Sequence, residues 1–132
     1  MIRLYPKWKE ALIGGEAGAA LVGTVRAALI NRGIYAYSDA HQFFTALAGA
    51  VVGAPQDLAG LTYGNGIFAA GPVVNFPLVA GATVGAIVIY VWTGSPATSR
   101  LVYYTDEAAG LPIVPDGGDE TITWDSAGIF QL

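Results

Sequence analysis

The chain has 132 residues, of which 54% are hydrophobic and 12% charged, and its formal net charge is −4. This length suits a single domain, residues 1–132, with one core, and the negative charge argues against binding nucleic acid through its phosphates. Because charged residues make up about 25% of a typical soluble protein, the surface is expected to be unusually apolar.

Two explanations compete for the apolar excess: a membrane span, or a surface that partner proteins cover. The longest apolar run without turn residues, 86–92, is much shorter than the ~18 residues of a transmembrane helix. The first residues lack the apolar core of a signal peptide. Cysteine is absent, which excludes disulfides and fits an intracellular assembly environment. We therefore expect no membrane segment and a surface that binds proteins.

The first part of the chain is predicted to combine a helical turn with extended segments. Pro6, followed later by Gly14 and Gly15, indicates a short N-terminal helical turn. A strand over residues 24–30 comes next, and after a turn the chain is expected to be extended again over residues 34–37.

The segment after Ser38 is predicted to be a short helix over residues 39–47, with Ser38 as its N-cap. Ser38, Asp39 and His41, the only histidine, also suggest a hydrolase triad. On a helix, however, these residues would not align as nucleophile, base and orienting group, and no Gly-x-Ser-x-Gly motif accompanies them. A capping serine and a solvated histidine explain the pattern better.

The remaining chain is divided by glycine and proline into short β-rich runs. Residues 86–92 are β-branched and aromatic, which is typical of a strand covered on both faces, so we place this strand in the middle of a sheet. Gly64-Asn65-Gly66 between two apolar runs predicts a hairpin. Further strands are expected at 51–54, 61–63, 67–68, 73–76, 101–105, 121–124 and 129–130.

These elements predict an all-β fold, either a β-sandwich or jelly-roll-like, with one short helix near residues 39–47 and the short N-terminal helical turn. The acidic loop 116–120 lacks the spaced ligand series of a calcium loop and is interpreted as a solvated turn. We predict no catalytic residue, no metal site and no cofactor, and we expect that the protein is not an enzyme.

The two ends of the chain carry opposite charge. Three of the six basic residues fall within the first ten positions, whereas six of the ten acidic residues follow residue 105. The basic residues alternate with aromatic ones, a pattern that binds an acidic protein surface or stacks on bases, or that packs as a plug on its own domain. We interpret residues 1–15 as a docking segment with these partner-binding residues: Arg3, Leu4, Tyr5, Pro6, Lys7, Trp8 and Lys9.

Three segments of the chain resemble a family of small virion proteins of tailed bacteriophages: residues 4–12, residues 24–29 followed by 35–41, and residues 110–119. The similarity extends along nearly the whole chain. Members of that group are similar to the cement or decoration proteins that sit on icosahedral capsids and clamp neighbouring major capsid subunits, often through β-sandwich or jelly-roll domains.

The resemblance implies a non-enzymatic structural protein that binds and stabilises the assembled shell of the major capsid protein. It implies a location on the capsid surface of the virion after synthesis in the bacterial cytoplasm. We expect a homodimer or homotrimer that binds neither nucleic acid nor membrane. Two alternatives stay open: a tail or neck protein of the phage, and a carbohydrate-binding β module in which Trp92, Trp124 and several tyrosines form a sugar platform.

Overall fold

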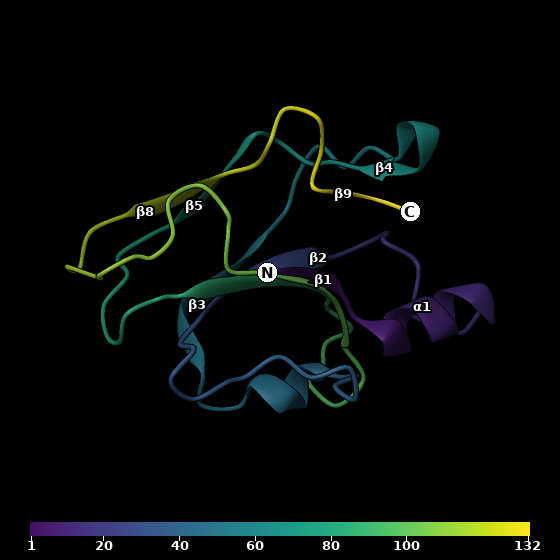
Figure 1. Ribbon diagram of the computed structural model, residues 1–132, viewed down its shortest axis with the longest axis horizontal. Coiled ribbons are helices and arrows are strands. Elements are labelled where there is room, and N and C mark those ends of the chain that lie inside the picture. Colours follow the sequence, from purple (N-terminus) through teal and green to yellow (C-terminus); the bar gives the residue numbers. More distant parts are fainter.

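A five-stranded antiparallel sheet organises the computed structural model, which describes all residues from 1 to 132 (Figure 1). Its strands, in spatial order, are β1 (Ile2–Leu4), β7 (Arg100–Thr105), β6 (Ala86–Val91), β2 (Val25–Ile30) and β3 (Val51–Asp57). The all-β fold predicted from the sequence is confirmed.

Strand β6 occupies the middle of this sheet, and every one of its residues is buried. It pairs with β2 from Val25 opposite Val91 to Ile30 opposite Ala86, and with β7 on its other side. Apolar residues on both faces of a strand require cover above and below. The prediction of a central strand over residues 86–92 is therefore confirmed.

Each face of the sheet has its own cover (Figure 1). On one face lie two short ribbons, in which β5 (Val73–Phe76) pairs with β8 (Glu120–Thr123) and β4 (Ile67–Phe68) pairs with β9 (Phe130–Gln131). The other face is covered by residues 31–50, which are mostly irregular. The molecule is thus a sandwich in which the second β layer is split into two ribbons. One cluster of 32 buried hydrophobic residues connects the layers.

Of the helix predicted over residues 39–47, only the last turn forms, as a 3-10 helix at Phe44–Leu47. The residues before it are extended and pair with the start of β7: the Phe44 amide donates to the Ser99 carbonyl (2.8 Å) and the Leu101 amide donates to the Gln42 carbonyl (3.0 Å). These tertiary hydrogen bonds replace the helical ones. Residues 34–37 form no strand either.

Near the N-terminus, the predicted helical turn is a regular α-helix, α1 (Pro6–Ile13), with proline in its first turn. Strand β1 just before it was not predicted from the sequence. The turn at Gly64-Asn65-Gly66 forms as expected: Asn65 adopts a left-handed conformation, and Thr62 and Ala69 exchange backbone hydrogen bonds across it (2.9 and 3.0 Å). Strand β4, however, pairs with β9 rather than within this hairpin.

Gly128 shapes the turn that leads into β9. Its φ of 118° lies in the region that favours glycine, and a Cβ there would overlap Cγ2 of Ile67 on the neighbouring strand β4. Gly117 also has a positive φ, 88°, but a Cβ there would meet nothing within 4 Å.

We expect Gly128→Ala to destabilise the protein more than Gly117→Ala does. Both variants carry a backbone cost of about 1 kcal/mol, and Gly128→Ala adds an overpacking cost of roughly 1–3 kcal/mol. Urea unfolding of the two variants measures the difference. Equal losses in the free energy of unfolding would show that β9 does not pack on β4 as described.

Candidate functional site

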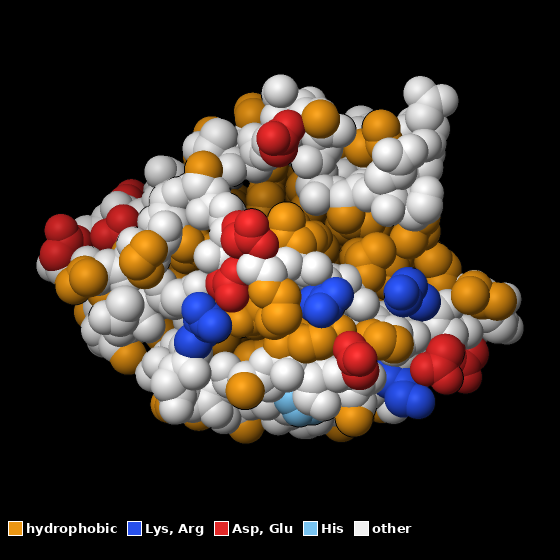
Figure 2. Space-filling model, in the orientation of Figure 1, with side chains coloured by type: hydrophobic (Ala, Val, Ile, Leu, Met, Phe, Trp, Pro, Cys, Tyr) orange, Lys and Arg blue, Asp and Glu red, His pale blue; other side chains and the backbone are white.

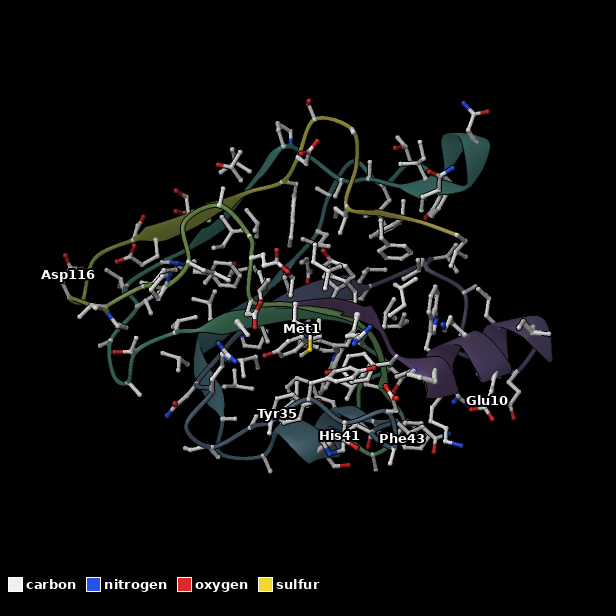
Figure 3. All side chains as sticks on the ribbon, viewed as in Figure 1. Met1, Glu10, Tyr35, His41, Phe43 and Asp116 are labelled. Carbon is white, nitrogen blue, oxygen red and sulfur yellow. The ribbon has the colours of Figure 1, made fainter.

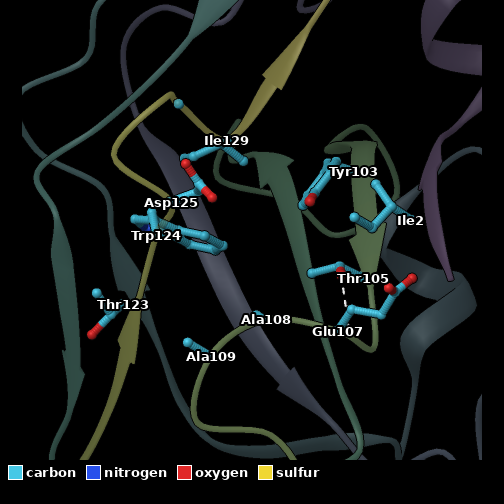
Figure 4. A pocket seen from close by; sticks show the side chains of 11 residues that line it. Ile2, Tyr103, Thr105, Glu107, Ala108, Ala109, Thr123, Trp124, Asp125 and Ile129 are labelled. Carbon is cyan, nitrogen blue, oxygen red and sulfur yellow. Dashed lines mark hydrogen bonds between the residues drawn. The ribbon is translucent and has the colours of Figure 1, made fainter.

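An open groove runs along the side of the molecule where β1 ends the five-stranded sheet. It consists of two adjoining cavities, of about 330 and 430 Å³, that share Ile2, Tyr103 and Ile129 in their walls. Figure 4 shows the first cavity, which extends to Trp124, and the second extends towards Lys9. In Figure 2, hydrophobic side chains fill a hollow between the upper and lower layers.

The floor of the groove is one face of the sheet edge. The register of β1 with β7 places Ile2 opposite Thr105 and Leu4 opposite Tyr103, so these four side chains lie on the same face. Ile2 is 54% exposed, although it is large and apolar. Tyr103 and Thr105 are only 4% and 2% exposed, so the part of the floor that the rest of the chain leaves uncovered is Ile2, with the half-buried Leu4 beside it.

The opposite wall comes from the end of the chain, at Ile129 and Phe130. The Phe130 ring stacks on Tyr103, with 5.5 Å between ring centroids and 24° between planes. The same ring meets the edge of Trp8 at 5.8 Å. Phe130 is thus held by one aromatic residue of the sheet and one of α1, and these contacts set the width of the groove.

Strand β1 leaves one of its backbone edges unpaired. The Tyr5 amide donates to the Val102 carbonyl (2.9 Å), and the Met1 carbonyl accepts from the Asp106 amide (3.2 Å). In an antiparallel pair, the backbone hydrogen bonds of successive residues point alternately towards and away from the neighbouring strand. The odd-numbered residues of this segment therefore bond to β7, and the backbone groups of Ile2 and Leu4 point away from β7. No strand pairs with that side of β1.

Charge differs between the two ends of the groove. Lys9 lines the second cavity, which has no acidic residue in its wall, and Arg3 borders the cavity although its side chain belongs to the opposite face of β1. Glu107 and Asp125 line the first cavity. The α-amino group of Met1 forms ion pairs with Asp106 and Glu107, and the hydrogen bond to Asp106 is the main cause that raises the pKa of this amino group. The groove therefore has a basic end and an acidic end.

Only part of the predicted docking segment reaches this groove. Arg3, Leu4 and Lys9 line it. Tyr5 and Trp8, which were also predicted to bind a partner, have side chains that are 0% and 1% exposed. They pack into the protein's own core, since burying an aromatic ring at a tied-down terminus is favourable.

The other two residues of that segment lie outside the groove. Pro6 begins α1, and the Lys7 ammonium lies 3.3 Å from the Glu10 carboxylate on the same helix. Sequence reasoning missed Tyr103, Ile129 and Phe130, which complete the site from β7 and the last residues of the chain. The strand expected at 129–130 was the only indication of this wall in the sequence. The sequence did not indicate which residues of the fold that strand would lie beside.

A separate cluster of phenols lies under the opposite face of the sheet. The hydroxyls of Tyr5 and Tyr35 share a hydrogen bond of 2.6 Å, and the Tyr35 hydroxyl also lies 2.8 Å from Nδ1 of His41. Figure 3 shows Tyr35 and His41 in the lower layer. Burial raises the pKa of Tyr35 to about 12, and burial also raises the pKa of Tyr5. These phenols are thereby kept neutral.

The residues of the suggested triad do not act together. His41 bonds to Tyr35, the Ser38 hydroxyl accepts the backbone amide two residues later, and Asp39 accepts the hydroxyl of Tyr37 (2.7 Å). Each of the three has a different partner. The geometry gives Ser38 no base to activate it, which agrees with the interpretation of these residues as structural.

The acidic loop also uses its carboxylates within the chain. Asp116 accepts the Gly118 amide (2.9 Å), and Asp119 accepts the Leu78 amide (3.1 Å). No three His, Cys, Asp or Glu side chains are grouped so that they could hold a metal ion. None of the helices has the length and apolar character needed to cross a bilayer.

The aromatic residues proposed as a sugar platform are largely covered. Trp124 is 7% exposed, and its indole N–H has no acceptor within the chain. Trp92 lies beneath the guanidinium group of Arg26, 5.0 Å from the ring centroid. Two open, coplanar rings of the kind that stack on sugars are not formed by these tryptophans.

No protein-family model matches the chain, and no curated protein matches it.

We expect the free energy of unfolding to fall above pH 10. A folded-state pKa raised from 10 to about 12 for Tyr35 contributes stability that is fully present below pH 10 and is lost as the pH rises through 12. Urea unfolding at a series of alkaline pH values measures this loss. Tyr35→Phe should be less stable than the wild type at neutral pH and should lose less between pH 10 and 12. An identical pH dependence for the two proteins would contradict this assignment.

Proposed function

We propose that this protein is a non-enzymatic structural component of a bacteriophage virion, and most specifically a capsid cement or decoration protein. The observation that carries the proposal is the uncovered apolar groove beside the unpaired edge of β1. The resemblance of three segments to small virion proteins supports the setting. The groove supports the mode of action, which is docking on another protein.

The apolar surface extends beyond the groove itself. A third cavity adjoins it through Phe130 and is lined by Leu21, Tyr63 and Leu132. Tyr63 and Leu132 are 50% and 61% exposed. Contiguous exposed apolar surface of this kind is typical of sites that bind other proteins. Part of the exposed apolar surface therefore adjoins the groove, which supports a docking role for this side of the molecule.

A docking role also agrees with the chemistry of the polar residues. Ser38, Asp116 and Asp119, which suggested catalysis or metal binding, accept hydrogen bonds from backbone amides, and Asp39 accepts one from the Tyr37 hydroxyl. A protein that binds the assembled shell and not the free capsid subunits stabilises the shell by mass action. A homodimer or homotrimer would multiply the number of contacts that each assembly makes with the shell.

Two alternatives predict different particles. In a capsid lattice, the copy number follows the number of major capsid subunits, whereas a tail or neck ring has a small fixed copy number and the symmetry of the tail. The carbohydrate-binding alternative has less support, because Trp92 and Trp124 are covered. Imaging of intact particles distinguishes lattice from ring, and binding to a glycan array without binding to shells would favour the carbohydrate module.

We expect Ile2→Glu to abolish binding to empty shells assembled from the major capsid protein of the phage that encodes the chain. A charge on the groove floor must be desolvated when a partner covers it, so binding should weaken by a factor on the order of tenfold or more. Co-sedimentation with shells, and separately with unassembled capsid subunits, measures binding.

The matched control is Val114→Glu, which adds the same charge at a residue that is 76% exposed and outside the groove. This variant should bind shells as the wild type does. If wild-type protein sediments with neither shells nor particles, the virion proposal fails. If both variants bind equally well, the groove is not the docking site.

A further inference from the structure

We propose that the groove binds an extended segment of a partner protein, which adds to β1 as a further strand and alternates apolar with acidic side chains. The inference rests on the proposed docking function and specifies the chemistry of the partner. Three features carry it: the unpaired backbone of β1, the apolar groove on the face of Ile2 and Leu4, and the basic side chain of Arg3 on the opposite face of the same strand.

The backbone of β1 is arranged to accept a strand. The amides and carbonyls of Ile2 and Leu4 point away from β7, and no strand of the chain pairs with them. Exposed strand edges of this kind are templates for pairing with a further chain, because the added backbone satisfies hydrogen-bonding groups in register. Hydrogen bonds to these groups would supply affinity without depending on the partner's sequence.

Side chains beside β1 then select the partner. Successive residues of an added strand point to opposite faces of the sheet. Those on the face of Ile2 and Leu4 would enter the groove, whose wall there includes Ile129 and Phe130. The others would lie on the face of Arg3, because Arg3 alternates with Ile2 and Leu4 along β1. This arrangement selects a strand in which apolar and acidic residues alternate.

The charges favour an acidic segment of a different protein over a second copy of this chain. A twofold pairing of two β1 strands through Ile2 and Leu4 would place Arg3 directly opposite Arg3 of the other copy, and like charges at opposite positions are destabilising. The acidic residues of the C-terminal third offer no free strand either: Glu120 begins β8, which is paired with β5, and Asp116 and Asp119 cap turns.

A direct test uses a short peptide that alternates valine and glutamate, and a matched peptide that alternates valine and lysine. Amide hydrogen exchange is measured by NMR on the full chain with each peptide. The glutamate peptide should slow exchange at Ile2 and Leu4 by a factor on the order of tenfold, because it pairs with those amides. The Arg3 amide faces β7 and should change little. No slowing with the glutamate peptide, or equal slowing with both peptides, overturns the proposal.

Two pairs of variants separate the backbone contribution from the charge contribution. Leu4→Pro removes the outward amide, so the glutamate peptide should no longer slow amide exchange at Ile2. Leu4→Ala also shortens the side chain but keeps the amide, so the peptide should still slow exchange at Ile2. Arg3→Glu should weaken peptide binding on the order of tenfold, because it reverses the charge on the face that receives the glutamates. Lys7→Glu makes the same charge change on α1, outside the groove, and should have little effect.

Thermal unfolding of each variant confirms that it is folded before the comparison is made. If Leu4→Pro is unfolded, the comparison of Arg3→Glu with Lys7→Glu still decides, and equal peptide binding by these two variants overturns the proposed acidic partner. If neither peptide binds but Ile2→Glu still prevents binding to shells, strand addition is wrong and the docking function stands. If the glutamate peptide binds but the protein does not bind shells, strand addition stands and the virion role is wrong.

Discussion

The constraint on which the rest of the structure depends is that the central sheet must be covered on both faces. Strands β6 and β7 consist mostly of apolar residues that are fully buried, and each Å² of apolar surface removed from water contributes about 25 cal/mol. Residues 31–50 cover one face and the two ribbons cover the other (Figure 1). Once both faces are covered, no further segment closes the edge at β1, and the groove is the result.

The aromatic residues near the N-terminus hold the groove in shape. Trp8 contacts Phe130 and donates a hydrogen bond from its indole to the Ala19 carbonyl (2.7 Å), while Tyr5 anchors the end of β1 in the core. The two ends of the chain are therefore held side by side at one site. For this reason, deletion of residues 1–9 would remove both the docking edge and part of the core, and loss of binding by such a deletion would not separate docking from folding.

The chain has few charged residues, and their positions make the two ends of the groove differ in charge. Lys9 lies at one end of the groove, Glu107 and Asp125 lie at the other, and Arg3 lies on the opposite face of β1. Because these groups are at the rim, they are expected to steer association and set its register more than to supply affinity, and their effect should weaken with added salt. Affinity depends mainly on the apolar floor and the free backbone.

The sequence by itself determined the all-β class, the central position of residues 86–91, the N-terminal helix and the turn at Asn65, because these depend on local pattern and short-range geometry. The tertiary structure alone decided three things. Backbone pairing with the start of β7 replaced all but the last turn of the helix expected over 39–47. Tyr5 and Trp8 packed inward because a nearby core was available to bury them. Phe130 stacked on Tyr103, a contact between distant residues that no local pattern records.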